Sequence, residues 1–221
     1  MTGKLKPYIA ESFEASFVNN CLVLFGEAYQ YIKENAGISI DWEEENISAT
    51  IFDYIDKSEN AIIWNINISD EHRLYYKEIL TGRKPAKTAA RIDFRITTNW
   101  TEQKKRLEYF VEAKNLIESD CKKAGRKTKI VAHKLHIRYV ETGIDNYISG
   151  KYPQKGCLVG YVLQGEPKNI INKINAYLCN KQRTTEQLKV ASSTIYNLKF
   201  CYQSAHDNGI YLKHFLLKFS A

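Results

Sequence analysis

Apolar side chains recur at helical spacing in two segments near the N-terminus, residues 8–34 and 42–57. The first segment predicts either one long helix or two short helices that break at Asn19–Asn20. The second predicts an amphipathic helix, and Asp41 followed three residues later by Glu44 matches a capping box at its start. Its isoleucines repeat every four residues: Ile47, Ile51 and Ile55.

Alternation of apolar and polar residues predicts strands farther along the chain. It first appears over 62–68, and a Ser-Asp pair then predicts the cap of a short helix over 69–80. The later apolar runs that predict strands cover 90–97, 107–116, 156–165, 194–203 and 210–219. Helical spacing returns over 127–149 and 167–180.

The mixture of helices and strands predicts an α/β fold. No Pro-, Gly- or Ser-rich linker divides the chain, and the sequence contains no internal repeat. We therefore expect one α/β domain over residues 39–221, preceded by a helical extension over residues 1–38.

The composition is that of a globular protein with an excess of positive charge. Of the 221 residues, 44% are hydrophobic and only 4 are proline. Lys and Arg number 32 against 25 Asp and Glu, which gives a net charge of +7. This excess favours polyanionic partners, such as nucleic acid or an acidic membrane face.

The cysteines and the N-terminus indicate a cellular compartment. None of the 5 cysteines forms a C-x-x-C pair, so we expect reduced thiols rather than disulfides or a zinc site. The N-terminus lacks the apolar core of a signal peptide, and no apolar run has the length of a transmembrane helix. We expect a cytoplasmic protein that does not enter a membrane.

Charged residues interrupt two of the apolar strand segments. Asp93 lies in 90–97, and Glu112 and Lys114 lie in 107–116. Side chains alternate between the faces of a strand, so Glu112 and Lys114 project to the same side. If the two strands are neighbours, Asp93 can approach that side as well. The two carboxylates and the Ala113 carbonyl are hard oxygen ligands of the kind that Mg²⁺ prefers.

These residues resemble the metal-dependent nucleases of the PD-(D/E)XK superfamily, which includes restriction endonucleases. The resemblance is carried by Arg-Ile-Asp-Phe at 91–94 and by Tyr-Phe-Val-Glu-Ala-Lys at 109–114, within residues 40–165. Ile92 replaces the proline of the motif, a common variation in that family. The resemblance implies a restriction-endonuclease-like core, with a central mixed sheet flanked by helices.

The resemblance also implies roles for individual residues. Asp93 and Glu112 would bind Mg²⁺ or Mn²⁺ together with the Ala113 carbonyl, and Lys114 would assist the attacking water. A helical glutamate ahead of the first core strand often joins the metal site in this family. Glu44 is the matching residue here, with Glu45 in reserve.

A basic run over 121–134 could contact phosphates, each cation adding affinity by releasing counterions. We expect nucleic acid to be contacted by Lys122, Lys123, Arg126, Lys127, Lys134 and Arg138. Taken alone, the basic run is more typical of a solvated loop and helix start than of a nucleic-acid contact. For Arg138, the alternative is a surface ion pair with Glu141, three residues further along the predicted helix.

The histidines have ordinary structural explanations. His133 and His136 lie three residues apart on a predicted helix, but no third ligand follows at metal-site spacing. We expect a turn role for His206 and a sheet-edge role for His214.

Two functions remain open from the sequence. The first is a Mg²⁺- or Mn²⁺-dependent nuclease, acting on DNA in preference to RNA, with a role in phage defence. It would work as a homodimer or beside a partner protein that finds the target. The second is a catalytically inactive nuclease-like fold that serves as a basic nucleic-acid-binding or assembly module. In that case the charges at Asp93, Glu112, Lys114 and Arg95 would form salt bridges across a hairpin.

Overall fold

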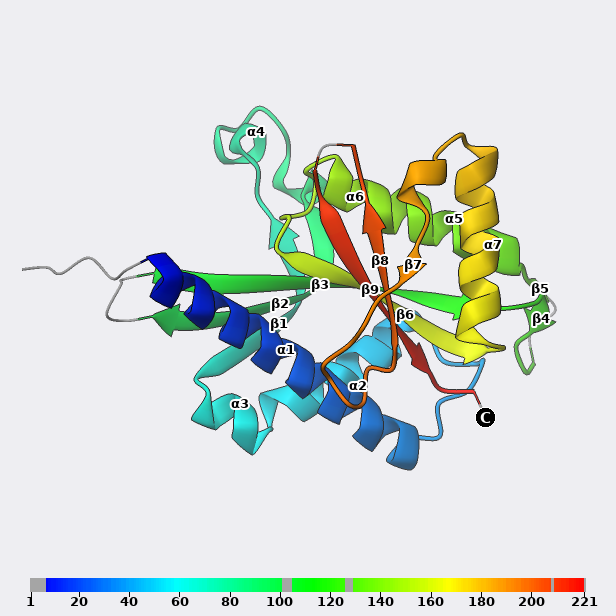
Figure 1. The fold of residues 1–221 in the computed structure, drawn as a ribbon, viewed down its shortest axis with the longest axis horizontal. Coiled ribbons are helices and arrows are strands. Elements are labelled where there is room, and N and C mark those ends of the chain that lie inside the picture. The colour runs from blue at the N-terminus through cyan, green and yellow to red at the C-terminus, as the bar shows by residue number, and fades with distance from the viewer. Residues whose placement is uncertain (1–6, 101–104, 126–128, 208, 221) are drawn as a thin grey trace, which may run out of the picture.

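Strands of one mixed β-sheet run through the centre of the computed structural model, which describes residues 7–100, 105–125, 129–207 and 209–220 (Figure 1). Within these residues the sheet has seven strands in the order β1-β2-β3-β6-β9-β8-β7. Their bounds are β1 Ile66–Leu74, β2 Ala90–Trp100, β3 Lys105–Ile117, β6 Gly156–Gln164, β9 Tyr211–Lys218, β8 Phe200–Ala205 and β7 Lys189–Val190. A separate two-stranded ribbon joins β4 (Cys121–Lys122) to β5 (Lys129–Ile130).

The strand directions divide the sheet into three parts, the last being β9, β8 and β7, which are antiparallel neighbours. β1, β2 and β3 are antiparallel neighbours, whereas β3, β6 and β9 are parallel. A parallel neighbour requires a crossover connection, and a helical segment provides it between β3 and β6. That segment comprises α5 (Ala132–Arg138), the π-helical turn η3 (Tyr139–Ile144) and α6 (Asp145–Ile148). Central β6 is buried from Cys157 to Leu163, as expected of a strand covered on both faces.

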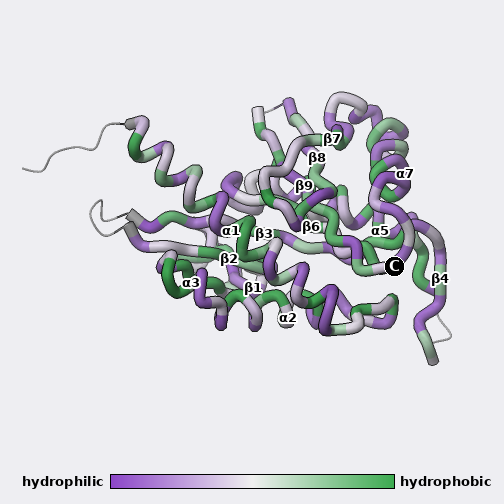
Figure 2. The backbone as a smooth tube through the Cα atoms, turned by 60° about the horizontal axis from the view of Figure 1, so that its bottom comes forward, coloured by the Kyte–Doolittle hydropathy of each residue, from purple (hydrophilic) through white to green (hydrophobic). Residues whose placement is uncertain are grey.

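Helices cover both faces of the sheet, as Figure 1 shows. One face carries α1 (Pro7–Asn35), α2 (Glu44–Asp56) and α3 (Glu59–Ile63), whose apolar side chains form one buried cluster with the sheet. The other face carries η3, α6 and α7 (Pro167–Asn180), which share a second cluster, while α5 contributes side chains to both clusters. Figure 2 shows hydrophobic and hydrophilic positions alternating along the flanking helices. The apolar stripe of each helix therefore supplies the core.

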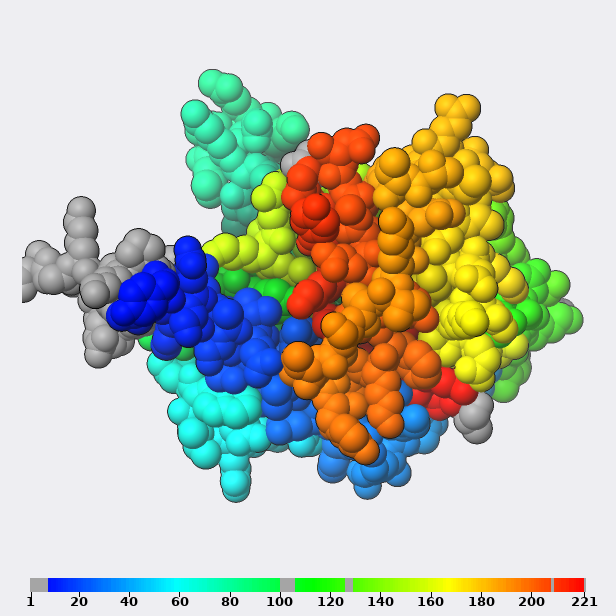
Figure 3. All heavy atoms as spheres, in the orientation of Figure 1, coloured from blue at the N-terminus to red at the C-terminus, as the bar shows by residue number. Residues whose placement is uncertain are grey.

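The remaining short helices lie in connections: α4 (Lys77–Leu80), η1 (Ala86–Thr88) and η4 (Thr184–Glu186). The segment around α4 projects from the body of the molecule (Figure 3). Among the described residues, no helix is both long and apolar enough to cross a membrane.

The N-terminal helices agree with the sequence pattern in type but differ in detail. α1 runs unbroken past Asn19–Asn20, and its buried face packs in the same cluster as the sheet. α2 begins at Glu44, and the side chain of its cap residue Glu43 makes no capping hydrogen bond. The capping box predicted at Asp41 is therefore wrong. Asp41 instead accepts a hydrogen bond from the Ala124 amide at 2.7 Å. The boundary between residues 38 and 39 stays a prediction.

The helix predicted over 69–80 is wrong for most of its length. β1 continues to Leu74 because its residues pair with β2 as far as Ala90, and only Lys77–Leu80 is helical. The ladder to a neighbouring strand overrides the local cap signal.

The observed starts of two other elements differ from the predicted ones. The helix predicted over 127–149 begins at Ala132, since Lys129–Ile130 pairs with β4. The strand predicted over 194–203 begins at Phe200, and residues 194–199 are irregular.

Candidate active site

Asp93 and Glu112 lie opposite each other where β2 and β3 separate. The last paired residues of these strands are Phe94 and Val111. Asp93 and Glu112 would be the next pair, but the main-chain ladder ends before them. Asp93 Oδ2 instead accepts the Ala113 amide at 2.6 Å, replacing a main-chain ladder bond with a carboxylate. The end of the ladder thus directs two carboxylates into one site.

Lys114 links these carboxylates to α2. Its Nζ donates to Glu112 Oε1, to the Ala113 carbonyl at 2.8 Å and to Glu44 Oε1 at 3.4 Å. Lys114 and Glu112 are each only 4% exposed. A buried ammonium of this kind needs such acceptors, because an uncompensated charge in the interior is costly.

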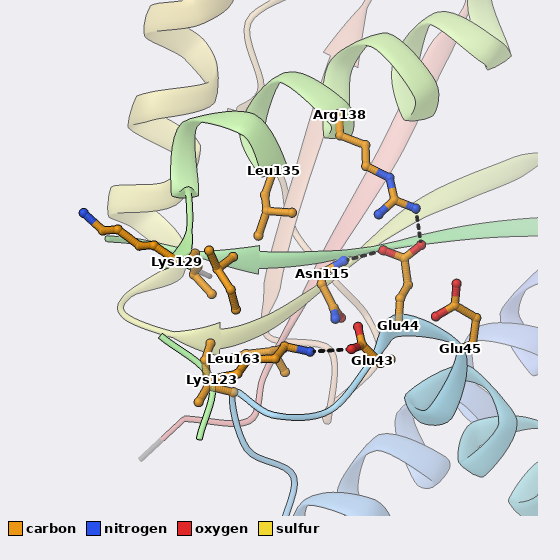
Figure 4. Close-up of a pocket in the computed structure, with 12 residues that line it drawn as sticks. Glu43, Glu44, Glu45, Asn115, Lys123, Lys129, Leu135, Arg138 and Leu163 are labelled. Atoms are coloured by element: carbon orange, nitrogen blue, oxygen red, sulfur yellow. Dashed lines mark hydrogen bonds and ion pairs between the residues drawn. The ribbon is translucent and has the colours of Figure 1, made fainter. Parts of the chain in front are cut away.

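Glu44 is the first residue of α2 and is buried. Its Oε2 accepts the Asn115 amide at 2.8 Å, and its Oε1 accepts Arg138 Nη2 at 3.0 Å (Figure 4). The side chain therefore connects α2, β3 and α5. Glu45, the reserve candidate, is exposed at the rim.

Burial shapes the electrostatics of the cluster. Burial and the nearby Glu112 carboxylate raise the pKa of Asp93 from 3.8 to about 7. Burial also raises the pKa of Glu112, despite the opposing effect of Lys114. Burial lowers the pKa of Lys114, but Glu112, Glu44 and Asp93 together bring it above its ordinary value. The site thus concentrates negative charge around one cation.

The oxygen atoms of this site fit a hard divalent cation. Glu112 Oε2 is buried and has no hydrogen-bond partner among the described residues. The Glu112 carboxylate and the Ala113 carbonyl both accept from Lys114 Nζ, and Asp93 is near enough to Glu112 for the two carboxyls to interact. Such oxygens are what Mg²⁺ and Mn²⁺ prefer. No three His, Cys, Asp or Glu side chains of the described chain form a metal-ligand group by themselves. The Ala113 carbonyl, water and substrate would have to complete the shell.

Two of the residues expected to contact nucleic acid are held by acids of α2. Lys123 Nζ pairs with Glu43 at 2.9 Å, and its side chain is largely buried. Arg138 is half-exposed and pairs with Glu44 instead of the alternative partner Glu141, which accepts the Tyr177 hydroxyl.

The other expected contacts lie away from the cluster or outside the described residues. Lys122 is exposed on β4 and Lys134 is exposed on α5. Arg126 and Lys127 are not among the described residues. Arg95, which could have formed a hairpin salt bridge with the cluster, pairs with Glu108. Among the described residues expected to contact nucleic acid, only Arg138 joins the acidic cluster.

Tyr152 and Asn115 belong to the site although no pattern in the sequence marks them. Tyr152 is buried, and its hydroxyl lies close enough to Glu112 to lower the pKa of that carboxyl, partly offsetting burial. Asn115 follows the Glu-Ala-Lys motif and brings its amide nitrogen to Glu44. The loop that carries Tyr152 is irregular, so only the folded chain places it.

A second buried polar chain lies apart from this cluster. Tyr139 and Ser204 contact the two ring nitrogens of His214, at 3.0 and 2.9 Å. Ser204 also contacts His206 at 2.8 Å, and His206 Nδ1 meets Glu186 Oε2 at 2.5 Å. His214 is fully buried on β9, between β6 and β8, so the predicted sheet-edge role is wrong.

The cluster combines the parts that phosphodiester hydrolysis requires: oxygen ligands for a cation, a lysine beside them and an arginine at the opening. Preorganised charges in a water-poor site act more strongly than the same charges in water. No family model, curated protein or solved structure matches this chain in the comparisons made.

Proposed function

We propose that this protein is a divalent-metal-dependent nuclease, with DNA preferred over RNA. The observation that carries the proposal is the convergence of Asp93, Glu112 and Lys114 where β2 and β3 separate, with Glu112 and Lys114 each only 4% exposed. A structural salt bridge would need no second, partly buried carboxylate with a raised pKa.

Each residue of the cluster has a separate task in the proposed reaction. Asp93, Glu112 and the Ala113 carbonyl would hold Mg²⁺ or Mn²⁺. When bound, the ion supplies positive charge to the phosphate and lowers the pKa of a water ligand. Lys114, whose amine is held as the ammonium, orients the attacking water by donating hydrogen bonds. Glu44 positions Lys114 through a 3.4 Å contact.

Arg138 lies on the solvent side of the cluster, where substrate would arrive. Its guanidinium is half-exposed, although Nη2 pairs with Glu44. A guanidinium has further donors in a planar fork, which suits a phosphate. Arg138 therefore contacts the scissile phosphate or its neighbour in the proposed complex.

The arrangement of elements supports the family resemblance without establishing it. The order α2, β1, β2, β3, α5, β6, with β3 parallel to β6, is the arrangement expected of a restriction-endonuclease-like core. From the cysteine pattern of the sequence we propose a cytoplasmic location, and from the family resemblance we propose a role in phage defence. Target recognition would come from a homodimer or a partner protein.

The test is cleavage by purified protein. Plasmid, linear DNA and RNA are incubated with Mg²⁺ or Mn²⁺, and with EDTA. We expect metal-dependent cleavage that falls about 10²-fold to 10⁴-fold in Asp93→Asn, Glu112→Gln and Lys114→Met. Lys189→Met, an exposed lysine on the edge strand β7, is the matched control. Cleavage that survives both Asp93→Asn and Lys114→Met would refute the proposal.

A second candidate function is a non-catalytic nucleic-acid-binding or assembly module. It is favoured by one observation: Lys114 forms ion pairs with both Glu112 and Glu44, and Arg138 also pairs with Glu44, so these side chains already have partners within the protein. A gel shift with DNA that is unaffected by the substitutions above, with no cleavage by the wild-type protein, would support it.

A further inference from the structure

A cavity of about 300 Å³ opens beside the catalytic cluster (Figure 4). It lies between the ends of β3 and β6, the start of α2, the first turns of α5 and the β4–β5 ribbon. Its walls are aliphatic, and its charged residues are three acids (Glu43, Glu44 and Glu45) and three bases (Lys123, Lys129 and Arg138). The aliphatic residues are Ile40, Ile117, Ile130, Leu135 and Leu163.

The cavity and the catalytic cluster share two side chains. Glu44 and Arg138 line the cavity, and Glu44 also contacts Lys114 Nζ at 3.4 Å. A group bound in the cavity would thus be one side chain away from the lysine of the proposed reaction. This adjacency favours a part of the substrate over an unrelated small molecule.

The size and lining favour one flat, largely apolar group. Cavities that bind small ligands measure about 300–1,000 Å³ and are mostly apolar with a few placed polar groups. This cavity is at the lower limit, which suits a single nucleobase rather than a base pair. Lys129 and Arg138 at the rim are both about half-exposed, so they can reach the phosphate attached to such a base.

One polar atom in the wall specifies a hydrogen-bond donor. Asn115 lines the cavity, and its Oδ1 is buried without a partner among the described residues. Its Nδ2 already donates to the Trp42 carbonyl at 3.3 Å, which orients the amide. An unsatisfied buried acceptor is unfavourable, so a ligand N–H group that reaches Oδ1, after a small shift of the Asn115 side chain opens this atom to the cavity, gains affinity.

We propose that this cavity binds one unpaired base of the substrate strand, and that it prefers a base with an exocyclic amino group. The amino group donates to Asn115 Oδ1, the aliphatic walls pack on the faces of the base, and the rim cations hold the phosphate. The proposal rests on the nuclease function, since it gives that site a preference for single-stranded or distorted nucleic acid.

The first experiment measures binding of nucleoside monophosphates to the wild-type protein in EDTA, by isothermal titration calorimetry. We expect AMP to bind ~5-fold to 10-fold more tightly than IMP, which lacks the amino group, and CMP to exceed UMP likewise. Equal affinities within each pair, or the absence of saturable binding, would overturn the proposal. Because no metal is present, this result is independent of whether the protein cleaves DNA.

The second experiment fills the cavity with Leu135→Trp. We expect the variant to lose at least 10-fold in AMP affinity and to raise KM for single-stranded DNA with little change in kcat. Ile62→Trp adds the same side chain to an exposed position on α3 and serves as the control. Circular dichroism checks that Leu135→Trp is folded. A folded Leu135→Trp that binds AMP as tightly as the wild type does would also refute the proposal.

Discussion

Replacing Asp93 with asparagine should stabilise the protein while removing its proposed activity. The pKa of Asp93 rises from 3.8 to about 7, chiefly because the carboxyl is buried and Glu112 is near. At 1.36 kcal/mol per pKa unit, ionising Asp93 in the folded protein costs up to about 4 kcal/mol. Asparagine keeps an oxygen for the Ala113 amide but carries no charge.

The sign of the effect follows from linkage. A carboxyl with a raised folded-state pKa contributes stability that is complete below pH 3.8 and is lost as pH rises to about 7. The gain from Asp93→Asn should therefore be near zero at pH 3.5 and grow by about 1.4 kcal/mol per pH unit above 3.8. It should level off above pH 7.

Urea unfolding in EDTA at pH 3.5, 5.5 and 8 measures this gain. Asp70→Asn, at an exposed position on neighbouring β1, is the control and should change little. Adding Mn²⁺ at pH 8 should raise the stability of the wild type more than that of Asp93→Asn, because an ion that binds only the folded state stabilises it. A gain that does not depend on pH would refute the reasoning on burial.

Three further predictions concern the cluster and the buried histidine chain. Lys114→Met should abolish cleavage yet tighten Mn²⁺ binding by about tenfold, because the Lys114 ammonium occupies the same oxygens that would bind the ion. Electron paramagnetic resonance of Mn²⁺ measures the affinity. Weaker Mn²⁺ binding by the variant would contradict this competition between the ammonium and the ion. Glu44→Gln should lower kcat by about tenfold or more, because Lys114 loses the contact that positions it. Glu45→Gln, at the exposed neighbouring position, should leave kcat unchanged. Equal kcat values for the two variants would exclude a positioning role for Glu44. Burial and nearby His206 lower the pKa of His214 to about 3. The contribution of neutral His214 to the free energy of unfolding is therefore complete above pH 6.5, and it is lost towards pH 3 at about 1.4 kcal/mol per pH unit. His214→Leu should be about 2–4 kcal/mol less stable at pH 7, since two buried hydroxyls lose their partner, but it should show a flatter acid profile in urea unfolding; an unchanged slope would contradict this assignment.

The sequence by itself determined those features that depend on local periodicity. The four-residue repeat of isoleucines in α2 predicts its buried face, and the apolar runs predict β2, β3 and β6. Glu112 and Lys114 share one side of β3 because alternation is a property of any strand. These features need no knowledge of neighbouring elements.

Only the tertiary structure decided which distant residues meet. The end of the β2–β3 ladder brings Asp93 opposite Glu112, and the start of α2 brings in Glu44 while Glu45 stays exposed. The same dependence explains the errors. Residues 69–74 form a strand because β2 supplies hydrogen bonds, and His214 is central because β6 and β8 pair on either side of β9. Local patterns report the period of an element, but pairing and burial depend on partners far away in the chain.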